Sequence, residues 1–390
     1  MPWRERSPVD ERVQFISDYQ RQVFTMTELC DRYGISRKTG YAVVGRYEAE
    51  GARGLSPRSS RPGRSPQATA EPIVDAIVTM RTRYPTWGGK KIIAVLHAGH
   101  PTWALPAIST ANDILKRHEL VSPRRRRRPV GHPGYRPVVA IAANDVWTTD
   151  FKGQFRTRDA QPCYPLTLCD AFSRYVLACR GMLAPTSAGA FAVFRRAFRE
   201  YGLPAVIRSD NGEPFAAPSL GRLSRLSVWW IRLGITPELI EPASPYQNGA
   251  HERMHRTLKA ETTRPPAADL ASQQRRFTRF CRMYNDERPH EALAQQPPNR
   301  LYAKSPRAVP RHLSPVEYPG HYELRRVSAA GAISWQSRVL TVSTVLTHED
   351  VGLEPIDDGI WDLHFGPVRL GRFDERRHRI EPAGVWRRPR

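Results

Sequence analysis

Three acidic residues stand in contexts that could place carboxylates at one point. Asp150 lies in the apolar segment VWTTDFKG, and Asp210 follows the apolar run AVIRS. Glu252 lies on the first turn of a helix expected from about residue 250. Converging carboxylates repel one another unless cations bind between them, and oxygen ligands suit Mg²⁺ or Mn²⁺. Two such ions can activate an attacking oxygen and stabilise a leaving oxygen at a phosphodiester.

The elements that must position these acids follow an α/β pattern. Short apolar runs bounded by turn residues predict strands, and longer amphipathic runs predict helices. The expected elements are a strand at 146–153, a hairpin at 165–182, a helix at 187–202, a strand at 204–212 and helices at 244–264 and 270–285. Further along, short alternating strands with Gly turns predict a small antiparallel β-barrel of the SH3-like kind at 318–380.

The N-terminal part has the pattern of helices joined by tight turns. Residues 25–51 contain a short helix, a turn and a second helix that Ser36 would cap, which is typical of a helix-turn-helix. The second helix would present Arg37 and Lys38 to a DNA major groove; an ordinary helical hairpin is the alternative. Three helical segments in 70–122 predict a second helix-turn-helix or winged-helix-like unit.

The charge balance indicates a polyanionic partner. The 390 residues hold 60 Lys and Arg against 38 Asp and Glu, a formal net charge of +22, and more than half of the excess lies in residues 1–139. Such a charge repels itself unless a polyanion such as nucleic acid neutralises it; a genome that favours Arg codons is the alternative. Five arginines between prolines predict an exposed segment that contacts phosphate or remains a solvated linker: Arg124, Arg125, Arg126, Arg127 and Arg128.

Cysteine usage and hydropathy argue against several classes of protein. The five cysteines are scattered and form no C-x-x-C pair, which argues against a disulfide framework and a zinc ribbon. No run approaches the ~18 consecutive apolar residues of a membrane span, and no N-terminal segment resembles a signal peptide. We therefore expect a cytoplasmic, nucleoid-associated protein with no zinc and no membrane partner.

The three acids stand within longer motifs that resemble a known family. The motifs W-T-T-D-F-K-G, I-R-S-D-N-G-x-x-F and S-P-Y-Q-N-G-x-x-E-R-x-H-R-x-L-K follow one another along the chain. Their order resembles the catalytic core of DDE integrases and transposases, which has the RNase H-like fold of retroviral integrase. The whole chain is similar to bacterial insertion-sequence transposases of the IS481 type, whose core ends in Y-N-x-x-R-P-H-x-A-L, here YNDERPHEAL at 284–293.

The resemblance implies a role for each motif residue. Asp150 would contact both of two Mg²⁺ or Mn²⁺ ions, and Asp210 and Glu252 would each complete one. Basic residues four and seven positions after the family's Glu contact the DNA end, and Arg256 and Lys259 occupy those positions. Helical geometry agrees, because residues i, i+4 and i+7 share a face; a solvated basic face is the alternative. Two residues match the family's polar loop near the substrate: Gln247 and Asn248.

One feature departs from the retroviral pattern. Asp210 and Glu252 are separated by 41 residues, which is more than the resemblance implies. We expect the extra length in residues 220–240, where Trp229 and Trp230 could anchor a packed helix.

Asp170 is the strongest rival metal ligand. It follows the apolar run LTLC, and RNase H-type nucleases often use a fourth acid. The family resemblance instead makes it a structural residue at a strand end that pairs with Ser173 or Arg174, and we adopt that interpretation.

These patterns together predict a multidomain chain with α-helical helix-turn-helix units, an α/β RNase H-like catalytic core and a small β-barrel. The expected segments are a helix-turn-helix domain at 1–55, a linker at 56–69, a second helix-turn-helix or winged-helix-like domain at 70–122, an Arg-rich linker at 123–139, the catalytic core at 140–310 and the barrel at 318–380.

The function that these patterns and the resemblance imply is DNA transposition. The chain would bind the terminal inverted repeats of an element, hydrolyse phosphodiesters at its ends and transfer each 3′-OH strand into double-stranded target DNA. Joining two ends with one site per chain predicts at least a homodimer on DNA. The alternatives are a catalytically silent DNA-binding regulator derived from a transposase, and an RNase H-type nuclease that cuts without joining.

Overall fold

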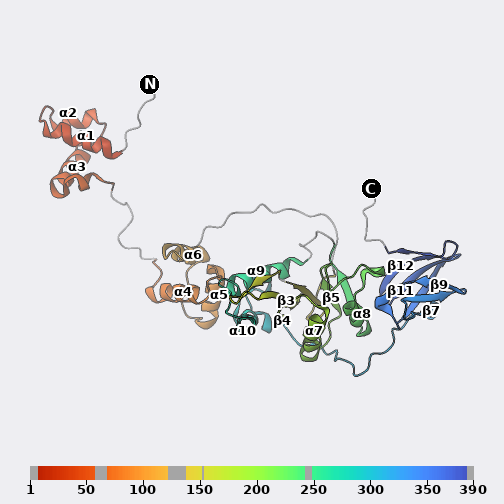
Figure 1. Ribbon diagram of the computed structural model, residues 1–390. Helices are drawn as coiled ribbons and strands as arrows, with labels where there is room; N and C mark the ends of the chain where they lie inside the picture. The colour runs from red at the N-terminus through yellow and green to blue at the C-terminus, as the bar shows by residue number, and fades with distance from the viewer. Residues whose placement is uncertain (1–7, 58–67, 122–137, 152, 242–247, 384–390) are drawn as a thin grey trace. The chain divides into compact units, whose positions relative to one another are not determined.

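The computed structural model describes residues 8–57, 68–121, 138–151, 153–241 and 248–383 (Figure 1). Some of the predicted DNA contacts lie outside the described residues: Arg124–Arg128 and Gln247. The chain divides into two compact units, Met1–Ala68 and Thr69–Arg390. Each unit is described by itself.

The first unit is a bundle of three helices, α1 (Pro8–Gln20), α2 (Met26–Arg32) and α3 (Arg37–Glu50). Thr25 and Glu28 form a capping box at the start of α2. Ser36 caps α3 as predicted, since its hydroxyl accepts the Thr39 N–H at 3.2 Å. The sequence indicated α2 and α3, and α1 completes the small core around Phe15 and Leu29.

Three helices open the second unit: α4 (Glu71–Arg83), α5 (Gly89–Gly99) and α6 (Ile108–Arg117). Ile77, Trp87 and Ile92 are buried between them. The third helix, α6, starts at Ile108, and no side chain caps it.

A mixed β-sheet follows the three helices. Its strands are β1 (Val146–Phe151), β2 (Phe155–Arg156), β3 (Pro162–Asp170), β4 (Val176–Met182), β5 (Val206–Ser209) and β6 (Thr236–Leu239). The order is β2-β3-β1-β5-β6, with β4 paired to β3. The central strand β1 runs antiparallel to β3 and parallel to β5, so one edge of the sheet collects the carboxyl ends of β1 and β5.

Helices cover both faces of this sheet, which is the RNase H-like layering that the sequence predicts (Figure 1). On one face α7 (Ser187–Tyr201) and α8 (Arg225–Arg232) pack with Trp147 and Phe194. The predicted packed helix in the long segment is α8, whose Trp230 is fully buried. On the other face α9 (Gly249–Thr262) and α10 (Leu270–Arg282) share an apolar cluster with β3 and β4.

The C-terminal part is an antiparallel β structure. Its strands are β7 (Glu323–Arg326), β8 (Ala332–Trp335), β9 (Arg338–Thr341), β10 (Asp350–Asp357), β11 (Ile360–Phe365), β12 (Val368–Asp374) and β13 (Arg379–Pro382). Five strands form a sheet in the order β13-β12-β11-β10-β7, and β8 pairs with β9. The predicted antiparallel strands are thus confirmed; within residues 318–383 no pairing of β13 with β7 closes the sheet, so the SH3-like barrel stays a prediction.

Within the second unit, the segment after α10 contacts the helices α4 and α5. A π-helical turn spans Met283–Glu287. Tyr84 donates to Glu287, Lys90 pairs with Glu291, and Lys91 donates to the Pro289 carbonyl. We call this contact the α4–α5 dock; it is formed by the 284–293 motif that the sequence placed at the end of the catalytic core.

Candidate active site

Asp150 and Asp210 lie at the same edge of the sheet. Thr148 of β1 is paired with Arg208 of the parallel strand β5. Continuing this register by two residues sets Asp150 beside Asp210, which directly follows β5. Because side chains alternate along a strand, Thr148, Asp150, Arg208 and Asp210 share one face, while Thr149 is buried on the other. The two acids are therefore neighbours on the face that α9 covers.

Burial affects the two carboxylates differently. The Asp150 side chain is 27% exposed and lies 3.5 Å from Nδ1 of His255. Burial raises the pKa of Asp210, and the hydrogen bond that its Oδ1 accepts from the Gly212 N–H at 3.3 Å opposes this only in part. Asp210 therefore lies where a carboxylate is costly to ionise without a nearby cation.

Glu252 reaches this region on the first turn of α9. The helix packs on the sheet through His251, Met254, His255 and Leu258, all of which are buried. Glu252 is exposed and precedes the buried His255, the neighbour of Asp150, by three residues, so about one helical turn separates the two. The same helix thus carries Glu252 and contacts Asp150.

Arg256 and Lys259 are exposed on α9, on the side of the helix that carries Glu252. Asn248 precedes the first residue of α9 and is buried. In the first unit, Arg37 and Lys38 are exposed on the first turn of α3. All five predicted contact residues within the described part of the chain are polar, and four of them face solvent.

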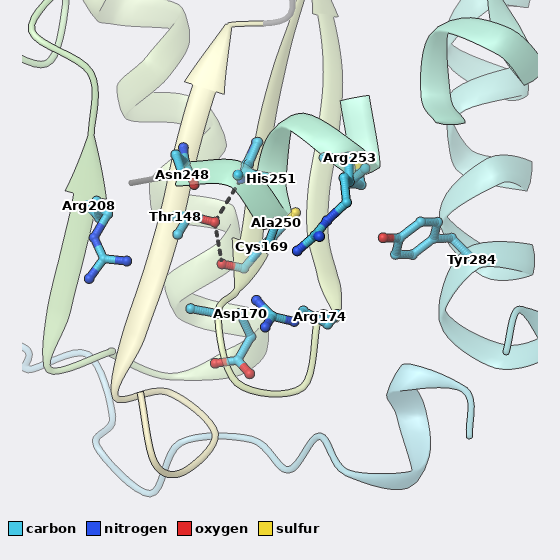
Figure 2. Close-up of a pocket in the computed structure, with 13 residues that line it drawn as sticks. Thr148, Cys169, Asp170, Arg174, Arg208, Asn248, Ala250, His251, Arg253 and Tyr284 are labelled. Atoms are coloured by element: carbon cyan, nitrogen blue, oxygen red, sulfur yellow. Dashed lines mark hydrogen bonds between the residues drawn. The ribbon is translucent and has the colours of Figure 1, made fainter. Parts of the chain in front are cut away.

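A cavity of about 190 Å³ opens at the start of α9 (Figure 2). Arg174, Arg208 and Arg253 contribute to its lining. Burial lowers the pKa of the Arg174 guanidinium, and the nearby charge of Arg253 lowers it further. Arg208 is offset by a buried ion pair with Glu238, at 2.7 Å. The cavity is therefore a positively charged recess close to the acids.

Asp170 has the structural environment that the family resemblance implies. Its Oδ2 accepts hydrogen bonds from the backbone N–H and the hydroxyl of Ser173, at 2.8 and 2.6 Å, and its Oδ1 accepts the Asn144 N–H at 2.8 Å. Oδ2 thus closes the turn between β3 and β4, and Oδ1 holds the segment that precedes β1. The predicted pairing with Ser173 is confirmed.

Four polar residues beneath α9 are not among the site residues predicted from the sequence: Thr148, Thr167, His251 and His255. They form short side-chain contacts between the helix and the sheet, and the two histidines are T-shaped with ring centroids 4.5 Å apart. A signal was present, because histidines at i and i+4 of an amphipathic helix share a face. That face is the buried one here.

The carboxylates offer the right kind of ligand for a divalent metal ion, but they are not gathered into a finished site. Among the described residues, no three or more His, Cys, Asp or Glu side chains are grouped so that they could hold a metal ion. The donor chemistry fits Mg²⁺, since Asp150, Asp210 and Glu252 supply only oxygen. The raised pKa of Asp210 also fits, because a cation would offset the cost of its ionisation.

Four families of known domains match segments of the chain. Residues 141–245 and 233–298 match families that are both described as Integrase core domain. Residues 11–63 match a Helix-turn-helix domain, and residues 39–115 match a Homeodomain-like domain. No described helix is both long and apolar enough to cross a membrane.

Individual proteins are also similar to parts of this chain. The chain is 28% identical over 188 residues to an uncharacterized 31.7 kDa protein of insertion element IS407 from Burkholderia multivorans, a match that covers 46% of this chain and 64% of that protein. The HTLV-2 integrase catalytic core domain in complex with magnesium is 15% identical, with a TM-score of 0.34, covering 42% of this chain and 100% of that one. A simian T-cell lymphotropic virus intasome chain is 15% identical, with a TM-score of 0.37, covering 75% of this chain and 97% of that one.

The matches place helix-turn-helix and homeodomain-like segments before segments of the integrase core type. Together with the insertion-element relative, they support the interpretation of the chain as an insertion-sequence transposase. Integrase cores depend on a divalent metal ion. Membership of the IS481 type stays a prediction.

Proposed function

We propose that the chain is a DDE transposase. It binds the terminal inverted repeats of an insertion element, hydrolyses a phosphodiester at each end and joins the exposed 3′-OH to target DNA. The observation that supports the proposal is the parallel pairing of Thr148 with Arg208, because the same register two residues further would bring Asp150 beside Asp210, near the helix that carries Glu252. Water and a 3′-OH are both weak nucleophiles, so one acidic site can serve both steps in turn.

In this proposal Asp150, Asp210 and Glu252 bind Mg²⁺ or Mn²⁺, two ions per site. The bound ions would activate the attacking oxygen and offset charge on the leaving oxygen. The raised pKa of Asp210 supports this role, because its ionised form needs a cation. Arg256 and Lys259 would hold phosphates of the element end, and the Arg174 and Arg253 recess adds positive charge nearby.

The remaining contacts and the domain organisation belong to the same proposal. Arg37 and Lys38 would read a major groove from the first turn of α3. The Arg-rich segment, Gln247 and Asn248 would contact DNA along and beside the site. Pairing of two element ends requires at least two protomers. The proposed domain limits are those expected from the sequence: 1–55, 70–122, 140–310 and 318–380.

Neutralising each acid tests the proposal. Asp150→Asn, Asp210→Asn and Glu252→Gln should each lower end cleavage and strand transfer by at least about a hundredfold, since each removes a metal ligand. The assay uses terminal-repeat oligonucleotides of the element, a target plasmid and Mg²⁺. Glu213→Gln is the matched control, because Glu213 is exposed and lies three residues from Asp210.

The outcomes separate the alternatives. Wild-type strand transfer by any of the three variants would refute the assigned site. Cleavage without joining by the wild-type protein would indicate an RNase H-type nuclease. Repeat-specific binding without cleavage in Mg²⁺ or Mn²⁺ would indicate a DNA-binding regulator.

A further inference from the structure

A chain of polar contacts runs beneath α9 and ends at Asp150. The Thr148 hydroxyl lies 2.7 Å from Nδ1 of His251, and Nε2 of His251 lies 2.7 Å from the Thr167 hydroxyl. The same hydroxyl lies 2.6 Å from Nε2 of His255, whose Nδ1 lies 3.5 Å from Oδ2 of Asp150. Figure 2 shows the beginning of this chain, where Thr148 lies between His251 and the Cys169 carbonyl.

Burial constrains how protons are arranged along the chain. Both imidazoles are 2% exposed, so a charged ring is costly and a neutral ring has one donor and one acceptor nitrogen. Only one arrangement keeps both rings neutral and lets His255 donate to Asp150. In it Thr148 donates to His251, His251 donates to Thr167, Thr167 donates to His255, and His255 donates through Nδ1. In this arrangement His251, Thr167 and His255 each donate once and accept once, and Thr148 donates once.

Two contacts compete with this arrangement. The Thr148 hydroxyl also lies 3.3 Å from the Cys169 carbonyl, but it lies closer to His251, at 2.7 Å. The Thr167 hydroxyl also lies 3.1 Å from the backbone carbonyl of Asp150. Donation there alone would leave Nε2 of His255 to carry the proton and would turn the lone pair of Nδ1 toward a carboxylate. The closer approach of Thr167 to His255, at 2.6 Å, favours the arrangement that ends in a donor.

We propose that His255 is a positioning residue for Asp150. The ring is buried and held by Thr167, so its Nδ1 lies at a fixed position 3.5 Å from Oδ2 of Asp150, from which it can donate toward that carboxylate and orient the side chain at the sheet edge. The proposal rests on the function proposed above, in which Asp150 is a metal ligand. It also gives a reason for the spacing E-R-x-H, because one helical turn separates Glu252 from the residue that orients Asp150.

A pair of substitutions at His255 isolates the donor to Asp150. Asn places an amide N–H near the position of Nδ1, whereas Gln places its amide near Nε2 and reaches Thr167 instead. His255→Gln should therefore raise the Mg²⁺ concentration for the half-maximal thermal shift by about tenfold or more. His255→Asn should stay within about threefold of the wild-type protein.

The readout is the Mg²⁺-dependent melting temperature of the full chain, measured by scanning fluorimetry without DNA. The affinity for repeat DNA in EDTA is measured beside it and should be the same for both variants, because the contact to Asp150 lies in the metal site. A purely structural role would lower the metal-free melting temperature of both variants and leave the Mg²⁺ midpoint unchanged. That result, or equal loss of Mg²⁺ affinity in the Asn and Gln variants, overturns the proposal.

Two further variants keep the test decisive. Thr148→Val removes the first donor of the chain, and we expect it to raise the Mg²⁺ midpoint by a smaller factor, about threefold. If His255→Gln does not fold, Thr148→Val replaces it in the test. An unchanged Mg²⁺ midpoint in Thr148→Val then overturns the proposal. Asp150→Asn separates the two ideas. If it abolishes the Mg²⁺ shift while His255→Gln behaves as wild type, only the positioning role fails; if it keeps both the shift and cleavage, the proposed function fails.

Discussion

Asp210 combines a buried position with a proposed role that requires a negative charge. In the folded chain its pKa lies above the ordinary value of 3.8, chiefly because of burial. Between the ordinary and the raised pKa the folded state binds more protons than the unfolded state, so this residue makes stability fall as pH rises through that window. Ionisation of the half-buried Asp210 at the candidate site is therefore unfavourable for the stability of the metal-free protein.

Replacing this charge should stabilise the metal-free protein. We predict that Asp210→Asn raises the melting temperature at pH 7.5 in EDTA, and that the difference from wild type shrinks as pH is lowered toward 3.8. Saturating Mg²⁺ should reverse the order, because only the wild-type carboxylate gains from the cation. Scanning fluorimetry at several pH values measures this, with Glu213→Gln as control. A destabilised Asp210→Asn in EDTA would contradict the prediction.

At the scale of elements, α2 and α3 are joined by a close approach that depends on a glycine. A Cβ built on Gly40 would lie 2.5 Å from Sγ of Cys30 and 3.1 Å from Sδ of Met26, whereas Gly45 on the same helix has open space around it. The low helix propensity of Gly40 is thus outweighed by packing, since this glycine lets α3 approach α2 closely. Gly45 has no such contact within the first unit.

The two glycines offer a matched pair of substitutions. Gly40→Ala should destabilise the first unit by about 1–3 kcal/mol through overpacking, while Gly45→Ala should stabilise it by about 0.5–1 kcal/mol. Hydrogen exchange of α2 and α3 amides in the full chain measures both. Equal effects of the two variants would show that helix propensity, and not packing, determines the change in stability at Gly40.

Much of the fold was readable from patterns, and the failures have physical causes. The segments around β1, β3, β4, β5 and α7 were predicted because apolar runs and turn residues mark them. The sequence did not reveal α1, β10 or β13, because α1 has a weak apolar stripe and the two strands are bounded by charged residues that resemble loops. The apolar spacing of α3 would also bury Tyr41, but its side chain is 61% exposed.

The candidate site shows the same division. Motif order marked Asp150, Asp210 and Glu252, but a linear pattern carries no sheet register, and their proximity follows only from the pairing of β1 with β5. His251 and His255 were overlooked because their contacts with Thr148 and Thr167 join residues more than 80 positions apart. Such networks exist only once the helix lies on the sheet.

At the scale of the second unit, the α4–α5 dock links the helical segment to the core through charged contacts. Arg288 is 7% exposed; its Nη1 lies 3.1 Å from Oε1 of Glu261 on α9 and donates to the Thr86 hydroxyl at 3.0 Å. Thr86 in turn donates to Glu261 at 2.5 Å. Burial and the charge of Arg288 lower the pKa of Lys91 to about 8, so the charged form of Lys91 is unfavourable in this environment.

Arg288 should therefore hold the dock together. Arg288→Ala removes the cation that pairs with Glu261 and should cost up to about 3 kcal/mol. The loss should appear as faster hydrogen exchange in α4 and α5, with β1 and β3 unchanged. Arg279→Ala, at an exposed position of α10, is the control. Uniformly faster exchange across the core would instead assign Arg288 to the stability of the core.

The composition of the dock also changes how ionic strength acts on the protein. The Lys90 and Glu291 side chains are 48% and 76% exposed, so dissolved ions screen their attraction as they screen contacts between lysines and phosphates. Added salt weakens DNA binding because the release of counterions on binding becomes less favourable, and the same salt should loosen the helices from the core. A plot of the logarithm of DNA affinity against the logarithm of salt concentration then reports more ionic contacts than the DNA itself provides.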